Sequence, residues 1–240
     1  MATTQLVKNN RASRSTVFLK IQMAVSGLIF IGYVLLHMYG NLKAFAGQEA
    51  YDEYAHHLRT FGEPMLPYGG LLWIVRIVLI LAILAHLRAV FTLWARAGRA
   101  RSTSYSVKKN LGSTLSSRTM RWGGVALLLF IVWHLVHFTI VKPTLGGSYS
   151  SAEIKDSPFL MLLNSFDPSM WWVTVIYLLA LAALGMHLHH GVWSAAQTLG
   201  LTGSAASRAR AKLAAAFLAG VVAIGFALVP LGILFGVIKK

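Results

Sequence analysis

Histidine is the residue whose placement in this chain points to chemistry. His37, His86, His134 and His187 each lie within a different long apolar stretch. A polar side chain at lipid depth has no water to bond, so intramembrane histidines are rare and are associated with function. A low-spin haem b takes two neutral imidazoles, one on each face of the iron. Four such histidines, one per stretch, therefore predict two bis-histidine haem b sites.

The composition predicts a membrane protein. Of 240 residues, 56% are apolar and only 12% are charged, whereas a soluble domain has about 25% charged residues. The roughly 20 residues that a helix needs to cross a bilayer are reached by five apolar runs, at about 21–43, 69–95, 121–141, 170–197 and 211–238. We predict an all-α integral membrane bundle of five helices over residues 17–240, preceded by a basic tail over residues 1–16. The chain has no cysteine, which excludes iron–sulfur clusters bound by this chain.

The charges predict an orientation in the membrane. The net charge of +15 could indicate nucleic-acid binding, but the basic residues instead gather on one side. The N-terminus and the segments after the second and fourth runs hold no acid and 14 bases: Lys8, Arg11, Arg14, Lys20, Arg96, Arg99, Arg101, Lys108, Lys109, Arg118, Arg121, Arg208, Arg210 and Lys212. The other loops hold all seven acids. Because bases collect on the cytoplasmic side, we predict a multi-pass bacterial inner-membrane protein with a cytoplasmic N-terminus and no nucleic-acid partner.

With this orientation, residue counting gives each histidine a depth. His37 and His134 lie roughly 24 and 20 Å from the inner ends of their helices. His86 and His187 each lie roughly 15 Å from those ends. We therefore predict an outer pair, His37 with His134, and an inner pair, His86 with His187. The alternative is that these side chains are hydrogen-bond partners between helices.

Haem propionates need cationic or hydrogen-bonding neighbours. Candidates in the inner turns of the first and third helices are Gln22, Ser26, Arg121 and Trp122. Arg88, two residues after His86, would also reach a propionate, or extend to the inner interface. Arg76, in the outer half of the second helix, would serve the outer propionates or a quinone carbonyl.

Other histidines compete for these roles. His137 lies one turn after His134 on a similar face and is the chief rival ligand. His189 and His190 follow His187 but point elsewhere around the helix. The histidines at 56–57 belong to the acidic outer segment, where we expect them at the surface or in proton handling.

The two segments predicted outside the membrane differ in character. Residues 44–68 predict a short surface helix. Residues 142–169 contain the apolar piece PFLMLL at 158–163, which we expect to lie at the membrane interface. Trp171, Trp172 and Tyr177 open the fourth run and predict an interfacial aromatic belt.

Four short motifs carry a family resemblance: HMYGNLKAFAG at 37–47, AHLRAV at 85–90, RWGG at 121–124 followed by VWH at 132–134, and HLHHGVWS at 187–194. In order and in placement they resemble the cytochrome b membrane anchor of the succinate dehydrogenase/fumarate reductase family, the single-chain di-haem type. The resemblance covers roughly residues 17–238.

The resemblance implies a set of roles. His37 and His134 would bind a distal haem, and His86 and His187 a proximal haem nearer an iron–sulfur subunit. That subunit and a flavoprotein with the dicarboxylate site would dock on the cytoplasmic face. Electrons from succinate would reach a quinone, so the chain is expected to be the membrane subunit of succinate dehydrogenase, with no dicarboxylate chemistry of its own. The alternatives are the cytochrome b anchor of another respiratory oxidoreductase and a non-redox scaffold or transporter.

One departure from the family pattern concerns protons. Some relatives have a transmembrane glutamate beside the fourth ligand, but residues 184–186 are Leu-Gly-Met here, and no acid lies in any apolar run. Protons for quinone reduction would then enter from outside, through a histidine or through Glu49, Asp52, Glu53 or Glu63. Such uptake suits a low-potential quinone such as menaquinone.

Overall fold

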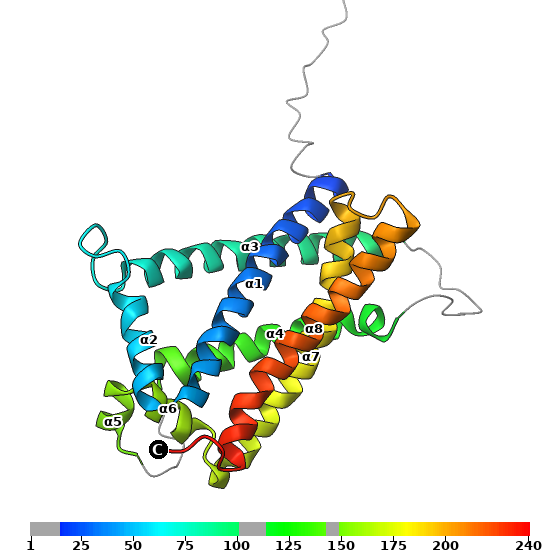
Figure 1. Cartoon of the computed structure of the whole chain (residues 1–240). Helices are drawn as coiled ribbons and strands as arrows, with labels where there is room; N and C mark the ends of the chain where they lie inside the picture. The colour runs from blue at the N-terminus through cyan, green and yellow to red at the C-terminus, as the bar shows by residue number, and fades with distance from the viewer. Residues whose placement is uncertain (1–14, 101–113, 143–148) are drawn as a thin grey trace, which may run out of the picture.

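The computed structural model describes residues 15–100, 114–142 and 149–240, and within these ranges every regular element is helical. Five helices are long and apolar enough to cross a bilayer. They are α1 (Thr16–Leu42), α3 (Gly70–Arg99), α4 (Leu115–Leu135), α7 (Trp171–Thr198) and α8 (Ala205–Leu234) (Figure 1). The predicted all-α, five-helix membrane bundle is confirmed.

Short elements connect the long helices. They are the 3₁₀ turn η2 (Lys43–Ala46), the helix α2 (Gln48–Thr60), the π-helical turn η3 (Val136–Ile140), the helices α5 (Ser151–Asp156) and α6 (Pro158–Ser165), and the 3₁₀ turn η4 (Pro168–Met170). The short helix expected within 44–68 is α2, and none of its residues is buried.

Three long helices begin before the apolar runs that predicted them. α1 starts at Thr16, α4 at Leu115 and α8 at Ala205. Each start is fixed by a hydroxyl that accepts a hydrogen bond from a first-turn backbone N–H: Ser15 from Phe18 (3.0 Å), Thr114 from Ser117 (3.2 Å) and Ser204 from Ser207 (3.0 Å). Such N-caps continue a helix into polar residues, which hydropathy does not register.

The two ends of the bundle differ in charge. α2, α5, α6 and the C-terminus lie at one end, and the start of α1 and the α7–α8 connection lie at the other (Figure 1). Arg96 Nη1 donates to Thr16 Oγ1 at 3.2 Å, so the end of α3 meets the start of α1. We call these the acidic end, which holds all seven acids, and the basic end, whose described bases are Lys20, Arg96, Arg99, Arg118, Arg121, Arg208, Arg210 and Lys212. Lys8, Arg11, Arg14, Arg101, Lys108 and Lys109 lie outside the described residues.

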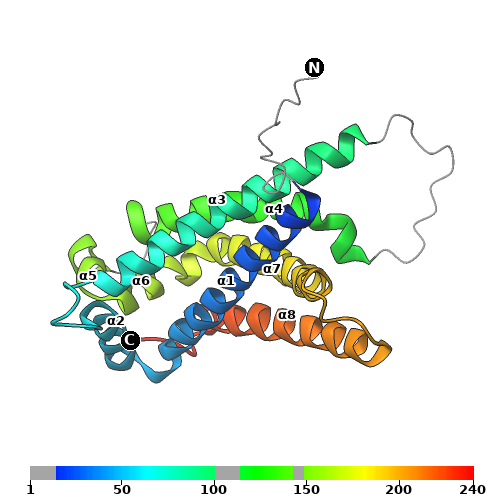
Figure 2. The ribbon, with the colours of Figure 1, turned by 90° about the horizontal axis from the view of Figure 1, so that it is seen from above.

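Helix α7 is central to the packing. It packs against α1, α4 and α8, and α1 packs in turn against α3 and α8. Seen from above, α7 lies between α4 and α8 (Figure 2). The long helices therefore form a packed series α3–α1–α7–α4, with α8 against both α1 and α7.

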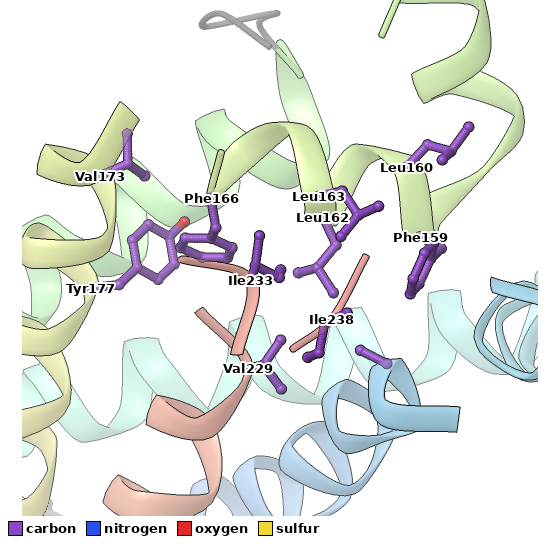
Figure 3. Close-up of a cluster of buried hydrophobic side chains, with 11 residues drawn as sticks. Phe159, Leu160, Leu162, Leu163, Phe166, Val173, Tyr177, Val229, Ile233 and Ile238 are labelled. Atoms are coloured by element: carbon purple, nitrogen blue, oxygen red, sulfur yellow. The ribbon is translucent and has the colours of Figure 1, made fainter. Parts of the chain in front are cut away.

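The apolar piece at 158–163, which we expect at the membrane interface, is a core element of the protein. It forms most of α6, in which Phe159, Leu160, Leu162 and Leu163 are between 0% and 7% exposed. These side chains pack with Tyr177 of α7 and with Val229 and Ile233 of α8 (Figure 3). Apolar contact with neighbouring helices, which the sequence does not reveal, covers them more completely than a bilayer surface would.

Asp52 of α2 fixes the position of α6. Its carboxylate accepts hydrogen bonds from the Ser157 hydroxyl at 2.5 Å and from the Phe159 backbone N–H at 2.9 Å. Ser157 is also the N-cap of α6, accepting from Leu160 N at 3.2 Å. A carboxylate at a helix N-terminus satisfies free N–H groups and the positive end of the helix dipole. This contact ties together the two segments at the acidic end that contain α2 and α6.

Replacing Asp52 by alanine should therefore destabilise the acidic end. Loss of two hydrogen bonds to a charged group predicts a decrease of about 1–3 kcal/mol in the free energy of unfolding. Thermal unfolding of the detergent-solubilised protein, followed by circular dichroism, measures it. Glu53→Ala is the matched control, because Glu53 is exposed one residue away and has no hydrogen bond among the described residues. Equal destabilisation by both substitutions would contradict the role of Asp52.

Candidate functional site

The structure brings His37 and His134 together. His37 lies near the end of α1 and His134 near the end of α4, and their ring centroids are 5.9 Å apart with the planes at 81°. Tyr33, one turn earlier in α1, stacks on His37 at 5.4 Å, and Phe226 of α8 lies 5.6 Å from it. The pair is therefore held among aromatic rings in the half of the bundle nearer the acidic end.

His86 and His187 form the second pair. His86 belongs to α3 and His187 to α7, and their ring centroids are 6.3 Å apart with the planes at 50°. Phe30 of α1 meets the His86 ring edge-on at 6.3 Å. The four histidines singled out from the sequence thus meet in the two combinations that residue counting predicts.

The ring separations fit a metal held between two imidazoles. Two rings bound through nitrogen at about 2 Å to one intervening metal would have centroids roughly 6 Å apart. Within the described residues no hydrogen bond joins the two imidazoles of either pair; instead, Nδ1 of His86 and Nδ1 of His134 each face a hydroxyl. The geometry is thus that of two ligands, and direct hydrogen bonding between the rings does not explain it.

The number of ligands distinguishes haem from a bare metal ion. In the described part of the chain, no group of three or more His, Cys, Asp or Glu side chains is placed to hold a metal ion. Bare metal ions in proteins usually take four or more ligands. Haem iron needs only axial ligands from the protein, because the porphyrin supplies the remaining four. Each two-histidine site therefore offers the two protein ligands that haem iron needs.

Helix packing leaves the paired helices apart. α1 and α4, which carry the first pair, are not among the closely packed helix pairs, and neither are α3 and α7, which carry the second. Each pair instead bridges helices that are second neighbours in the series α3–α1–α7–α4. A flat cofactor between two imidazoles needs this arrangement, because directly packed helices would leave it no width.

Glycines face the His86–His187 pair. A Cβ placed on Gly27 of α1 would lie 3.9 Å from His86 Cε1, and one on Gly124 of α4 would lie 3.7 Å from His187 Cε1. A Cβ at either position would therefore meet the ring at an ordinary van der Waals distance, and a longer side chain would reach into the space of the ring. The buried Nδ1 of His187 has no hydrogen-bond partner among the described residues.

Ser26 sets the tautomer of His86. Its hydroxyl donates to the Gln22 carbonyl oxygen at 2.7 Å and lies 3.0 Å from His86 Nδ1. Since the single hydroxyl hydrogen is engaged by the carbonyl, the serine oxygen must accept from His86 Nδ1–H. Nε2 of His86 then carries the free lone pair that binds a metal. Predicted as a propionate neighbour, Ser26 instead contacts the ligand.

The remaining predicted propionate neighbours lie in different places. Gln22 donates to the Ala85 carbonyl oxygen at 2.8 Å and accepts from Arg88 at 2.6 Å, so both residues lie beside His86. Arg121 lies over the Trp94 ring at 5.2 Å. Trp122 is 74% exposed and is not brought to either pair.

Arg76 is the predicted arginine nearest the His37–His134 pair. Its guanidinium lies over the Trp73 ring at 4.9 Å. It also interacts electrostatically with Tyr33, the residue that stacks on His37. Arg76 is thus placed toward this pair through Tyr33, without direct contact with either imidazole.

The rival histidines have other partners. His137 is 2% exposed, and its Nδ1 lies 2.9 Å from the Tyr177 hydroxyl. His189 Nδ1 lies 2.9 Å from Ser116 Oγ in the first turn of α4. In the described chain neither of these rings, nor that of His190, faces an imidazole from another helix. His56 and His57 are exposed on α2.

Of the acids predicted to take up protons, one makes structural hydrogen bonds and three are exposed to solvent. Asp52 is engaged at the start of α6, whereas Glu49, Glu53 and Glu63 make no hydrogen bond through their side chains within the described residues. Burial, with the Asp52 and Tyr54 charges, raises the pKa of Tyr51 to about 12. Tyr51 therefore stays neutral at physiological pH.

Tyr177 is the residue whose role the sequence misassigns. The prediction of an interfacial belt suits Trp171, which is 60% exposed, but it is wrong for Tyr177, which is 8% exposed. Its hydroxyl lies 3.4 Å from His134 Nδ1 as well as beside His137. The position of Tyr177 in the sequence could have revealed this. Tyr177 lies about 9 Å along the helix from Trp171, which is too deep for the same interface.

Comparison with known proteins gives one match. The family model described as succinate dehydrogenase/fumarate reductase transmembrane subunit matches residues 95–237, which include His134 and His187. No curated protein and no solved structure matches the chain. The match spans more than half of the sequence and includes the last two of the four motifs, at 121–134 and 187–194. The chain belongs to the succinate dehydrogenase/fumarate reductase transmembrane-subunit family.

Proposed function

We propose that this membrane subunit is a di-haem cytochrome b that passes electrons from an iron–sulfur subunit across the membrane to a quinone. The observation that supports it best is the pair of two-histidine sites, with ring centroids 5.9 and 6.3 Å apart, formed by four different helices. Each haem b would supply reversible one-electron transfer. The physiological complex is then a succinate:quinone oxidoreductase, a succinate dehydrogenase in which this chain performs no dicarboxylate chemistry.

The chain's own residues hold the two cofactors. His86 and His187 would bind the haem nearer the basic end, and Ser26 keeps His86 in the Nδ1–H tautomer. His37 and His134 would bind the haem nearer the acidic end, where aromatic rings exclude water. Gln22 and Arg88 are the propionate candidates beside His86, and Arg76 is the candidate near the other pair.

The charge difference between the ends orients the complex. We assign the basic end to the cytoplasm of a bacterium, by the positive-inside rule, and the flavoprotein and iron–sulfur subunits to the same face. The quinone is reduced near the His37–His134 pair. Since the acids all lie at that outer end, protons enter from outside, which suits menaquinone.

Haem content tests the proposal directly. In a complex purified with mild detergent, the reduced-minus-oxidised absorption spectrum should show haem b at two per copy of this chain. The absence of haem b, or a ratio well below two, would refute the di-haem function while leaving the family assignment intact.

Single ligand variants test the pairing. His86→Ala should remove one haem and leave the other spectrally present, and His37→Ala should remove the other one. Each variant should bind roughly one haem per chain, because the two pairs share no residue. The two remaining spectra should differ from each other and sum to that of the wild type. Loss of both haems from either substitution would point instead to a role in assembly.

A substitution of Gly124 tests whether its lack of a side chain leaves the space that the His86–His187 pair needs. Gly124→Val should displace His187, since a Cβ already reaches ordinary contact with that ring, and should remove at least half of the haem in the inner site. Gly220→Val in α8 is the control, because a Cβ at Gly220 meets nothing within 4 Å. The haem content per chain is measured for both variants. A normal haem content at the His86–His187 site in Gly124→Val would contradict the need for a glycine beside His187.

A further inference from the structure

The hydroxyl of Tyr177 lies between His134 of α4 and His137 of the following turn η3. It is 2.9 Å from His137 Nδ1 and 3.4 Å from His134 Nδ1. The tyrosine ring is fixed by Phe130 and Phe166, whose centroids lie 5.0 and 4.9 Å away at nearly right angles. Figure 3 shows the Phe166 ring beside Tyr177. Packing by Phe130 of α4 and by Phe166, which directly follows α6, therefore holds the buried phenol next to two imidazole nitrogens.

Proton counting gives the hydrogen bonds a direction. A tyrosine hydroxyl donates one hydrogen bond and accepts others, and a neutral imidazole carries one N–H. If His134 is to offer Nε2 to a metal, its proton must be on Nδ1, so Tyr177 must accept from it. The single phenolic hydrogen then goes to His137 Nδ1, which must be unprotonated.

The environment of His137 agrees with this direction. The residue is 2% exposed, and its Nε2 has no partner among the described residues. A buried polar atom left without a partner destabilises the fold and calls for an explanation. The explanation is that His137 is buried so that its Nδ1 can accept the hydrogen bond from the Tyr177 hydroxyl.

We propose that Tyr177, with His137 behind it, is a positioning residue that orients His134 and lowers the reduction potential of the haem held by His37 and His134. The proposal rests on the di-haem function above. A ligand imidazole that donates its second N–H to an acceptor becomes more basic, and a more basic ligand favours the oxidised iron. The acceptor is stronger when its own hydrogen is engaged by His137, since linked hydrogen bonds reinforce one another.

The other site offers a comparison within the same chain. Ser26 accepts from His86 Nδ1–H at 3.0 Å, with its own hydrogen engaged by a backbone carbonyl. The two sites therefore use the same arrangement with different groups, a serine and carbonyl in one and a tyrosine and histidine in the other. Each can be altered without touching its counterpart.

Redox titration of the purified complex, with the two haems assigned by the His37→Ala and His86→Ala spectra, tests the proposal. Tyr177→Phe should shift the midpoint potential of the outer haem upward and leave the inner haem unchanged, and Ser26→Ala should shift only the inner one. Phe166→Leu is the packing control; it loosens the same aromatic contacts but keeps the hydroxyl, and should shift neither.

A double-mutant cycle tests the part played by His137. His137→Phe should shift the outer haem in the same direction by a smaller amount. The double variant with Tyr177→Phe should match Tyr177→Phe alone, because His137 acts only through the phenol. Additive shifts of the midpoint potential would overturn the proposal that His137 acts through Tyr177.

The remaining outcomes are also decisive. An unchanged outer potential in Tyr177→Phe, or equal shifts in both haems, would overturn the inference and leave the di-haem function standing. Selective loss of the outer haem from Tyr177→Phe, with Phe166→Leu retaining both haems, would support positioning. Loss of both haems from Tyr177→Phe would show a general structural role instead.

Discussion

The separation between two imidazoles on different helices is the constraint on which the rest of this structure depends. The haem iron that we propose between the rings requires their centroids to be about 6 Å apart, and the helices that carry the rings must not close up on each other. The packed series α3–α1–α7–α4 meets both requirements. Direct contacts run between neighbours in the series, and each histidine pair joins second neighbours, so helix packing fixes the ring separation without filling the space between the rings.

The two pairs are supported in different ways. The His37–His134 pair lies close to the aromatic and aliphatic core formed by α6, α7 and α8, and α6 is held in turn by Asp52 of α2. The His86–His187 pair lies nearer the basic end, where the buried apolar side chains are few and hydrogen bonds from Ser26 and Gln22 join α1 to α3. Outer loops that look peripheral in the sequence thus act on one pair, and polar contacts within the helices act on the other.

The distribution of charge complements this arrangement. The apolar runs, which include Arg76 and Arg88, contain no acid. In the proposed function these arginines would face haem propionates. The seven acids lie at the acidic end, and the basic end holds eight of the 16 described Lys and Arg residues and no acid.

Much of the candidate site could be predicted because helical membrane proteins translate sequence position into depth. A rise of 1.5 Å per residue and a charge asymmetry suffice to place His37 with His134 and His86 with His187. The length of the apolar runs predicted the five long helices, apart from their capped, polar ends, and α2 lies within the 44–68 segment where a short helix is expected.

The sequence could not determine the direction around its helix in which a side chain at a given membrane depth points. Depth alone places Tyr177 near an interface and the 158–163 segment on a surface, and only the packing of α6 against α7 and α8 buries both. Depth also leaves His134 and His137 nearly equivalent. The fold separates them. The His134 ring meets His37 and lies 3.4 Å from the Tyr177 hydroxyl, whereas His137, in the π-helical turn η3, lies 2.9 Å from that hydroxyl and faces no imidazole of another helix in the described chain. The sequence by itself determined which groups share a level in the membrane, and the tertiary structure decided which of them meet, because contact depends on helix rotation and on neighbours distant in the chain.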